Sequence, residues 1–531
     1  RNRIELALRF DSGAPFARNT ALALISEPLR VAGAAATAQG PLAGSVIDGG
    51  IESFVAIPYV APPLGALRWR APQAPALRER LLEARAIGPG CPQPAGQGFF
   101  SGAAARHDED CLQLNVWRPA TPGPHPVMVW IHGGGLTQGS AVQLQNGVLL
   151  YDGAVYARRD VVFVSINYRL GPLGFLAQRD LRGEAPDHPQ SGNYGLLDQV
   201  AALAWVRANI AAFGGDPQRV TVYGESAGGV SSCVLLATPA ASGLFQRAIV
   251  QSGNCLWNAP SLDAGIEQGD RVTLAAGCVT APDRRACLRA LSVAALFAAG
   301  PPVISTGAST APGEVYGLVV DGYVLPESPG PAIAGGRAAP LPLLIGVNDD
   351  EHATLAPAAS LPATAAGYEA AVRSRFGLIG GEVVARYPAA AYPTPALAYQ
   401  DLLDDARFTC AARRAGADHA ARGNAVYQYV LTEILPDAGL VALESFHALD
   451  VLLLFGPRAQ AQAPERTLVA RMQRVWVDFA YGREPGSSDA IAWPRYRADA
   501  RQALEFNSAR SGLIDDYRRE YCAFWNRYAI L

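Results

Sequence analysis

The chain has 531 residues, of which 50% are hydrophobic and 17% charged, so the composition permits a large buried core and argues against intrinsic disorder. The formal net charge of −3 does not favour nucleic acid, whose binding proteins usually carry a concentrated basic face. No run of 18 apolar residues occurs, so no membrane span is predicted. Length alone favours two or three domains.

Residue types narrow the chemistry further. All 44 basic residues are arginine, because the chain contains no lysine. This excludes Schiff-base chemistry, a pyridoxal lysine and a Walker P-loop. The eight cysteines form no C-x-x-C pair and no H-E-x-x-H motif occurs, so neither a metal nor a cofactor is predicted. Disulfides are the expected use of the cysteines, which indicates a secreted or periplasmic protein.

The N-terminal part of the chain divides into two regions. Residues 1–36 are weakly periodic and are interpreted as an extension without a clear signal peptide, because the apolar run 21–25 is short and interrupted soon afterwards. From residue 37 onward, short extended runs separated by Gly and Pro predict an antiparallel sheet edge. The segment between Cys91 and Cys111 is interpreted as a surface loop closed by a disulfide; two free buried cysteines are the alternative.

The middle of the chain alternates between strand and helix patterns. Continuous apolar runs at 127–131 and 161–166 predict buried parallel strands, and 194–213 has apolar residues at helical spacing. Further strands are predicted at 220–222, 248–250, 341–346 and 426–430, and a C-terminal helix at 515–528. This order predicts an α/β fold with one large, mostly parallel, doubly wound sheet and helices on both faces.

Long insertions are expected within this sheet. Residues 255–340 and 355–420 are rich in Ala, Pro and Gly, and no linker or internal repeat separates a second core. Residues 37–531 are therefore predicted to form a single domain.

The motif that organises the chain is Gly224-Glu225-Ser226-Ala227-Gly228, which follows an apolar strand and precedes a helix. G-x-S-x-G between strand and helix is typical of the nucleophile elbow of α/β-hydrolases, so Ser226 is the predicted nucleophile. A glycine-rich loop with an incidental serine is the alternative.

A serine nucleophile needs a base, and on this fold the order is Ser, acid, His. His352, His419 and His447 follow Ser226. His419 lies in a polar helical stretch that is interpreted as solvated surface, whereas His447 lies in a loop beyond a strand and is preferred. Three adjacent carboxylates, at 349, 350 and 351, follow the strand at 341–346, and this pattern alone does not choose among them.

Taken together, its motifs make the chain resemble the type-B carboxylesterases, the cholinesterase-like family of α/β-hydrolases. The similarity runs from about residue 39 to 528. Its motifs lie at 109–115, 132–135, 167–171, 192–199, 213–217 and 224–229.

The resemblance implies a serine carboxylesterase with the triad Ser226, Glu351 and His447. It implies an oxyanion hole formed by backbone N–H groups of Gly134, Gly135 and Ala227. The chain departs from the family pattern at His352, where Gly usually follows the acid, and at Ala448, where Gly often follows the base. His352 is interpreted either as a structural filler or as a residue that tunes the pH dependence.

The resemblance also implies a set of structural bonds. The implied disulfides are Cys91–Cys111, Cys278–Cys287 and Cys410–Cys522, which would leave Cys233 and Cys255 free. Arg169 with Asp198 and Arg68 with Glu109 are hypothesised ion pairs.

Substrate choice is predicted from missing aromatic residues. Choline-binding relatives hold the ammonium over a Trp in the first disulfide loop, whereas residues 91–111 contain Phe99 and Phe100 but no Trp. The region 312–317 has little bulk except Tyr316, so we hypothesise a roomy acyl site for bulky, uncharged esters. A catalytically inactive binding or adhesion module and a lipase are the alternative functions, and the oligomeric state is not predicted.

Overall fold

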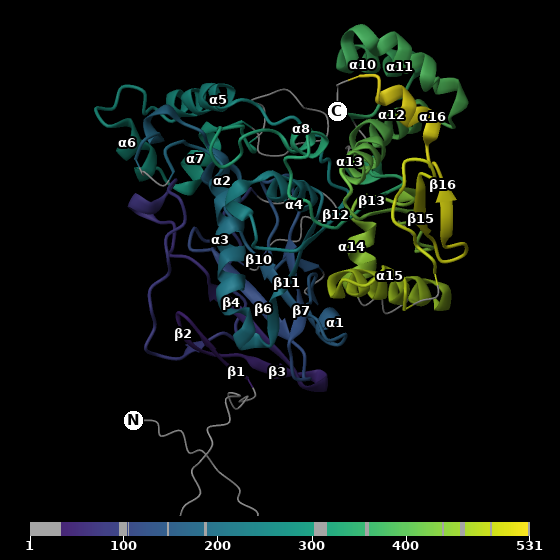
Figure 1. Ribbon diagram of the computed structural model, residues 1–531. Helices are drawn as coiled ribbons and strands as arrows, with labels where there is room; N and C mark the ends of the chain where they lie inside the picture. Colours follow the sequence, from purple (N-terminus) through teal and green to yellow (C-terminus); the bar gives the residue numbers. More distant parts are fainter. Residues whose placement is uncertain are drawn as a thin grey trace, which may run out of the picture.

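The computed structural model describes residues 33–94, 104, 106–145, 148–184, 188–301, 316–355, 360–437, 440–456, 462–488 and 491–528. Its centre is an eleven-stranded sheet in the order β16-β15-β14-β13-β12-β11-β7-β10-β6-β4-β3 (Figure 1). The strands are β3 (Ser45–Ile47), β4 (Ile51–Pro58), β6 (Gln113–Arg118), β7 (His125–Ile131), β10 (Val162–Ile166), β11 (Gly215–Glu225), β12 (Arg247–Gln251), β13 (Leu343–Asn348), β14 (Val426–Leu431), β15 (Gln502–Phe506) and β16 (Gly512–Asp515). Smaller sheets join β1 (Ala34–Thr37), β2 (Gly40–Ala43) and β5 (Leu82–Glu83), and β8 (Leu144–Gln145) with β9 (Val148–Leu149).

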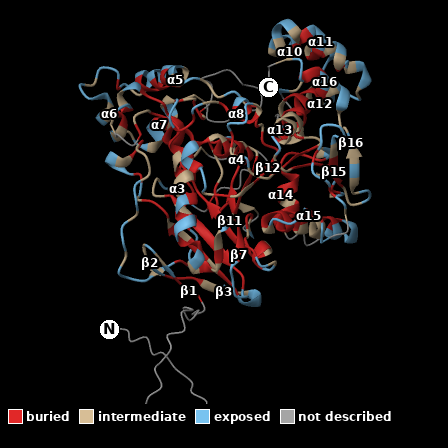
Figure 2. Ribbon diagram, viewed as in Figure 1, coloured by how far each residue is buried: buried red, intermediate tan, exposed pale blue. Residues whose placement is uncertain are grey.

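The centre of the large sheet is parallel and its N-terminal edge is antiparallel, as predicted, whereas the antiparallel edge formed by β15 and β16 was not predicted. Strands β10, β7, β11, β12, β13, β14 and β15 pair in parallel. The antiparallel pairs are β10 with β6, β6 with β4, β4 with β3, and β15 with β16. Every residue of β7, β10, β13 and β14 is buried, which explains why these strands are continuous apolar runs (Figure 2).

Helices cover both faces of the sheet, because alternate side chains of a strand point to opposite sides. Val127, Val129 and Ile131 of β7 belong to one buried cluster with residues of α3 and α4. Met128 and Trp130 belong to the other, with residues of α1, α14 and α15. The helices are α1 (Ala154–Ala157), α2 (Gly171–Phe175), α3 (Tyr194–Asn209), α4 (Ala227–Ala237), α5 (Leu262–Ala275), α6 (Arg284–Ala290), α7 (Val293–Ala299), α8 (Pro329–Ala334), α9 (His352–Leu355), α10 (Ala365–Phe376), α11 (Gly380–Arg386), α12 (Pro395–Asp404), α13 (Cys410–Ala420), α14 (Leu449–Phe455), α15 (Ala463–Tyr481) and α16 (Arg519–Trp525).

Helix α3 and the short turn η4 (Ile210–Phe213) together form the predicted crossover helix. Among the described residues, Tyr194–Phe213 is the one stretch long and apolar enough to pass a length-and-composition test for a membrane span. More than half of it is buried inside the protein, and Leu203 and Val206 contribute to the core. The segment is therefore accounted for as a core helix.

The predicted insertions contain helices in both cases. Helices α5 to α8 lie between β12 and β13, and α9 to α13 lie between β13 and β14. In Figure 1 the two groups lie at the upper part of the molecule and meet where α8 lies beside α13. The predicted C-terminal helix is wrong at its start, because 512–515 form β16 and left-handed backbone at Asp516 and Arg518 separates this strand from α16. Residues 1–32 of the expected extension lie outside the described residues, and the single-domain assignment of 37–531 stays a prediction.

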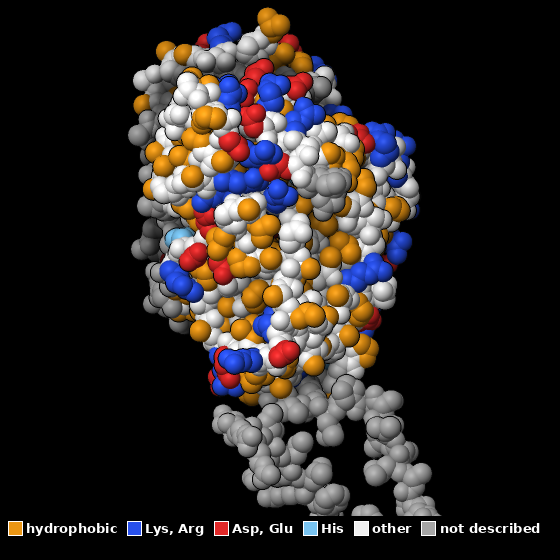
Figure 3. Space-filling view, turned by 90° about the vertical axis from the view of Figure 1, so that its left-hand side faces the viewer, with side chains coloured by type: hydrophobic (Ala, Val, Ile, Leu, Met, Phe, Trp, Pro, Cys, Tyr) orange, Lys and Arg blue, Asp and Glu red, His pale blue; other side chains and the backbone are white. Residues whose placement is uncertain are grey.

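The face at the left of Figure 1 mixes charges of both signs. Figure 3 shows arginine and acidic side chains gathered beside one another there, among scattered apolar side chains. Helix α6 lies on this side, and its Arg285 and Arg289 contact Glu184 at 3.2 and 2.6 Å. Acidic partners thus neutralise part of the positive charge on this face.

Four disulfides link the chain, and one of them corrects the sequence prediction. Cys91–Cys111, Cys278–Cys287 and Cys410–Cys522 are bonded, as the family resemblance implied. Cys233 and Cys255, expected to be free, form a fourth disulfide with a Cα–Cα separation of 5.4 Å. They meet because α4 and the loop after β12 leave adjacent parallel strands.

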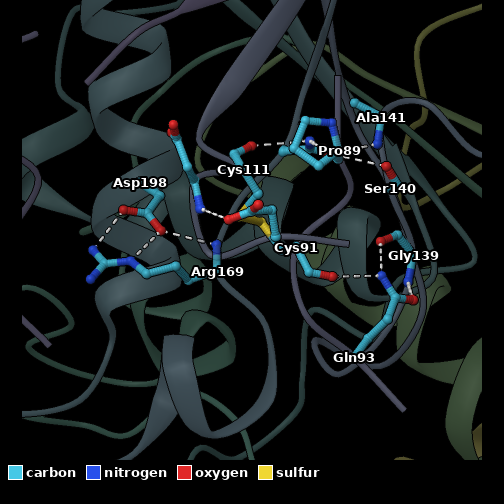
Figure 4. Close-up of a disulfide and its surroundings, with 12 residues drawn as sticks. Pro89, Cys91, Gln93, Cys111, Gly139, Ser140, Ala141, Arg169 and Asp198 are labelled. Carbon is cyan, nitrogen blue, oxygen red and sulfur yellow. Dashed lines mark hydrogen bonds and ion pairs between the residues drawn. A yellow bond between two sulfur atoms is a disulfide. The ribbon is translucent and has the colours of Figure 1, made fainter. Parts of the chain in front are cut away.

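Both predicted ion pairs are present, and the Arg169–Asp198 pair is almost fully buried. Nε and Nη2 of Arg169 donate to the two Asp198 oxygens at 2.8 and 2.7 Å, and the Arg169 backbone N–H donates at 3.0 Å. Figure 4 shows this pair beside the Cys91–Cys111 disulfide. Arg68 likewise contacts Glu109, with an Nη2–Oε2 distance of 2.9 Å.

Breaking the buried pair should destabilise the fold. Asp198→Asn would leave the Arg169 charge buried without its carboxylate, so we expect the free energy of unfolding to fall by about 3–5 kcal/mol. Urea unfolding followed by tryptophan fluorescence measures this change. Asp499→Asn, which removes the acidic partner of an exposed Arg497 pair, is the control and should leave the midpoint unchanged. Equal effects of the two substitutions would contradict the interpretation.

Candidate active site

Ser226 lies on a sharp turn between β11 and α4. Its backbone has φ 57° and ψ −121°, a conformation that non-glycine residues rarely adopt. A Cβ on Gly224 would lie 2.5 Å from Gly228 C, and one on Gly228 would lie 2.0 Å from Ile131 O. Both positions must therefore be glycine for β11, β7 and α4 to approach. Ser226 is half-buried while residues 224, 225, 227 and 228 are buried, so this tight turn presents the serine.

The glycine run after β7 lies against this turn. A Cβ on Gly133 would lie 3.0 Å from Ser226 Cβ, and Gly134 and Gly135 have φ of +100° and +64°. No loop or turn hydrogen bond within the described part of the chain uses the N–H of Gly134 or Gly135. Ala227 is the first residue of α4, where the helix leaves the N–H without an intrahelical acceptor. Within the described residues, these three N–H groups therefore have no backbone acceptor.

Two contacts hold the glycine loop in place. Gln93 exchanges two hydrogen bonds of 2.8 Å with Gly139, tying the loop to the Cys91–Cys111 segment (Figure 4). The His132 ring stacks on Tyr168 with centroids 4.5 Å apart, and the Tyr168 hydroxyl donates to His132 O. Burial lowers the pKa of His132 to about 4, so this histidine is neutral and structural at neutral pH.

Glu351 and His447 meet directly. His447 Nδ1 lies 2.5 Å from Glu351 Oε2, and both side chains are buried. The other Glu351 oxygen accepts from the backbone N–H of Asn348 at 2.9 Å. Ala448, after the histidine, has φ of 64°. An alanine thus occupies a left-handed position that glycine adopts more easily.

The two carboxylates before Glu351, between which and Glu351 the pattern alone did not choose, have other partners than His447. Asp350 Oδ2 accepts from the backbone N–H of Ser445 at 3.1 Å. Asp349 accepts from the Tyr517 hydroxyl. Glu351 is the member of this acidic run that faces His447.

The other nitrogen of His447 faces a carboxylate that the sequence reasoning gave no role. His447 Nε2 lies 3.0 Å from Oε1 of Glu225, the residue before Ser226. Nε2 makes no hydrogen bond within the described residues, including none to Ser226. The position of Glu225 inside the elbow motif was the available signal, but only the fold shows that it reaches the histidine.

Carboxylates control the charge of this imidazole. Burial alone lowers the pKa of His447, but Glu225 and Glu351 outweigh burial and raise that pKa to about 9. Burial raises the pKa of Glu225 to about 8, against the opposing effect of His447. Asp450 lies close by and accepts from Gln251 Nε2 at 2.7 Å.

The other candidates from the sequence make no hydrogen bond to His447 or Glu351 within the described part of the chain. His419 is buried rather than solvated, and its Nε2 lies 2.8 Å from Leu341 O. Tyr316 is buried in the core, whereas 312–315 and the predicted aromatic pair Phe99 and Phe100 lie outside the described residues. The acyl-site interpretation therefore stays a prediction.

One group of metal-ligand residue types occurs in the described ranges, and it does not fit a metal. It consists of Asp405, Cys410 and Cys522. The two sulfurs are joined in a disulfide, and Asp405 accepts from Arg518 Nε at 2.9 Å.

Comparison with known proteins places this site in a family. A profile described as "Carboxylesterase family" matches residues 32–525. The chain belongs to the carboxylesterase family. It is a carboxylic ester hydrolase with the α/β-hydrolase fold, as predicted.

Relatives among characterised proteins and solved structures agree with this assignment. The para-nitrobenzyl esterase of Bacillus subtilis (strain 168) is 34% identical over 89% of this chain and 94% of its own. The fumonisin B1 esterase of Sphingopyxis macrogoltabida is 34% identical over 85% of this chain and 82% of its own. The cocaine esterase of Oryctolagus cuniculus is 32% identical over 88% of this chain and 90% of its own. A solved thermophilic PNB esterase superposes with a TM-score of 0.80 at 31% identity, covering 93% of this chain and all of its own.

The Glu225 contact predicts a pH effect in this carboxylesterase. Glu225→Gln removes a carboxylate that raises the pKa of His447, so this pKa should fall and the acid limb of the kcat/KM profile should move down by about one pH unit. The profile should be measured on a neutral p-nitrophenyl ester. Asp499→Asn, an exposed substitution, is the control. An unmoved acid limb would mean that Glu225 carries no charge when the enzyme turns over.

Proposed function

We propose that this carboxylesterase works by acyl transfer through Ser226, with His447 as general base and Glu351 as the partner of the base. The observation that carries the proposal is the buried 2.5 Å contact between His447 and Glu351, with Nε2 of the same imidazole facing the elbow at Glu225. The family assignment supports a serine at this elbow as the nucleophile.

The first half-reaction forms an acyl-enzyme. Ser226 Oγ attacks the ester carbonyl carbon while His447 Nε2 takes the hydroxyl proton. The tetrahedral oxyanion accepts hydrogen bonds from the N–H groups of Gly134, Gly135 and Ala227. Each such donor contributes on the order of 2.7–4 kcal/mol to transition-state stabilisation. The C–O bond to the alcohol then breaks, and His447 returns the proton to the departing alkoxide.

The second half-reaction releases the acid. Water attacks the acyl carbon, His447 takes a proton from the water, and Ser226 leaves with that proton. Throughout, Glu351 accepts from Nδ1–H, which leaves the lone pair on Nε2 and stabilises the imidazolium once it forms. The carboxylates raise the pKa of His447 to about 9, so the fraction of uncharged base that can start the reaction increases as the pH rises.

We further propose that the substrates are bulky, uncharged esters rather than choline esters. The segment between Cys91 and Cys111 contains no Trp to hold a quaternary ammonium. Three relatives are named as esterases of para-nitrobenzyl, fumonisin B1 and cocaine. The four disulfides support a secreted or periplasmic location, because such bonds persist in oxidising compartments.

The nucleophile is tested by substitution. Ser226→Ala should lower kcat for p-nitrophenyl butyrate by more than about 1000-fold and abolish labelling by an active-site phosphonate. Ser242 is an exposed serine beyond the end of α4, the helix that follows Ser226. Ser242→Ala is therefore the matched control and should keep both activity and labelling. A folded wild-type protein without turnover or labelling would instead favour a binding module.

Substrate class is tested separately on the wild-type enzyme. A p-nitrophenyl ester series from acetyl to butyryl to benzoyl should show turnover that is maintained or rises with acyl size. Activity that increases sharply once the substrate exceeds its solubility would favour a lipase. A steady fall from acetyl to benzoyl would contradict the roomy acyl site.

A further inference from the structure

His352, the residue after Glu351, is bound to the helical layer on the far side of the acid. It is the first residue of α9 and is fully buried. Its Nδ1 lies 2.6 Å from Asp404 Oδ1, and its backbone N–H donates to the same oxygen at 2.7 Å. One carboxyl oxygen thus holds both the main chain and the ring of the residue next to the catalytic acid.

The helix that contains Asp404 makes a further hydrogen bond to His352, in addition to the two that Asp404 accepts. Asp404 is the last residue of α12 and is 5% exposed. Gln400, one turn earlier in this helix, donates from Nε2 to His352 O at 3.0 Å. The N–H, the C=O and the ring of His352 are therefore all bound by α12.

The turn that carries Glu351 is held on its other side by the loop that carries His447. Asn348 Nδ2 donates to Phe446 O at 2.8 Å, and the Ser445 N–H donates to Asp350 Oδ2 at 3.1 Å. Phe408, in the π-helical turn η9 (Asp405–Thr409) after α12, packs on both histidine rings, with centroids 5.5 Å from His352 and 5.3 Å from His447. The catalytic acid thus lies between the base loop and α12.

Hydrogen-bond chemistry assigns the proton in the His352–Asp404 pair. His352 Nε2 lies 3.5 Å from Arg407 Nη1, and a guanidinium is a donor only. Nε2 is therefore the acceptor, and Nδ1 carries the hydrogen that is donated to Asp404. Burial lowers the pKa of His352 well below its usual value, and burial followed by the Glu351 charge raises that of Asp404, so both groups favour their uncharged forms. Besides Arg407 and Glu351, the charged groups that influence the pKa values of His352 and Asp404 are Arg375, Asp350, Asp401 and His447.

We propose that His352 and Asp404 are positioning residues for ester hydrolysis, which fix the Glu351 turn to helix α12 and thereby set the orientation of Glu351 against His447. The inference rests on the proposed triad. It assigns a role to the position where this chain departs from its family, where His352 stands in place of the usual Gly. Because the pair favours its uncharged form, it orients Glu351 without placing a further negative charge behind it.

The test compares substitutions that break this hydrogen bond with substitutions that keep it. Asp404→Ala and His352→Gly remove the bond, so kcat should fall by about 10- to 100-fold with KM within about twofold of wild type, as for a displaced catalytic group. Asp404→Asn keeps an acceptor oxygen, and His352→Asn keeps an N–H donor in place of Nδ1–H. These two variants should retain kcat within about threefold of wild type, and Asp404→Asn should leave the acid limb of the pH profile in place.

The control is His419→Gln, which changes another buried histidine whose ring nitrogen binds a carbonyl oxygen. All kcat values are expressed per phosphonate-titrated site, so loss of folded protein does not count as loss of catalysis. If Asp404→Ala and His352→Gly leave no titratable protein, His352→Gln, which displaces the donor, carries the same expectation as the bond-breaking variants.

The outcomes separate this inference from the proposed function. An active Ser226→Ala variant would overturn the triad itself. An inactive Ser226→Ala together with a kcat for Asp404→Ala equal to that of His419→Gln would overturn the positioning role and leave the triad in place. A shifted acid limb in Asp404→Asn would also overturn the inference, because Asp404 would then act through its charge.

Discussion

The site depends on one backbone constraint, the strained positive-φ conformation of Ser226 between β11 and α4. Such a conformation costs on the order of 1–3 kcal/mol and persists only where the surroundings impose it. Here they do so through contact: Gly224 and Gly228 touch each other and the end of β7 at distances that leave no room for a Cβ. The parallel pairing of β11 with β7 and β12 holds this geometry from both sides.

The other parts of the site arise from the same sheet edge. Parallel strands end at one edge, so the loops after β7, β11, β13 and β14 lie close together although they are far apart in sequence. The loop after β7 contains Gly134 and Gly135, the turn after β11 contains Ser226, the loop after β13 contains Glu351, and the loop after β14 contains His447. Hydrogen bonds between the β13 and β14 loops, such as that from Asn348 to Phe446 O, bring acid and base into register.

Burial gives these groups their chemical character. Glu225, Glu351 and Asp450 surround one imidazole, and all are almost completely removed from water. In this setting a charge is stabilised only by a specific partner, so the carboxylates favour the charged form of His447. His352 and Asp404 show the complementary case, a buried pair whose environment favours the uncharged forms.

The sequence by itself determined the elements whose pattern is local. The apolar runs of β7, β10, β13 and β14, the spacing of α3 and the glycines around Ser226 each follow from a period or a steric need within a few residues. Motif and chain order led to the proposal of Ser226 and His447, and family motifs added Glu351 to that proposal. Family motifs also predicted three disulfides and two ion pairs, which the structure contains.

Only the tertiary structure decided the long-range contacts that no motif of the sequence indicated. The Cys233–Cys255 bond, the contact of Glu225 with His447 and the binding of His352 by Asp404 join residues separated by 22, 222 and 52 positions. The β16 strand that replaces the start of the predicted C-terminal helix likewise depends on pairing with β15. No local pattern encodes such contacts, because strand order and loop packing bring these residues together.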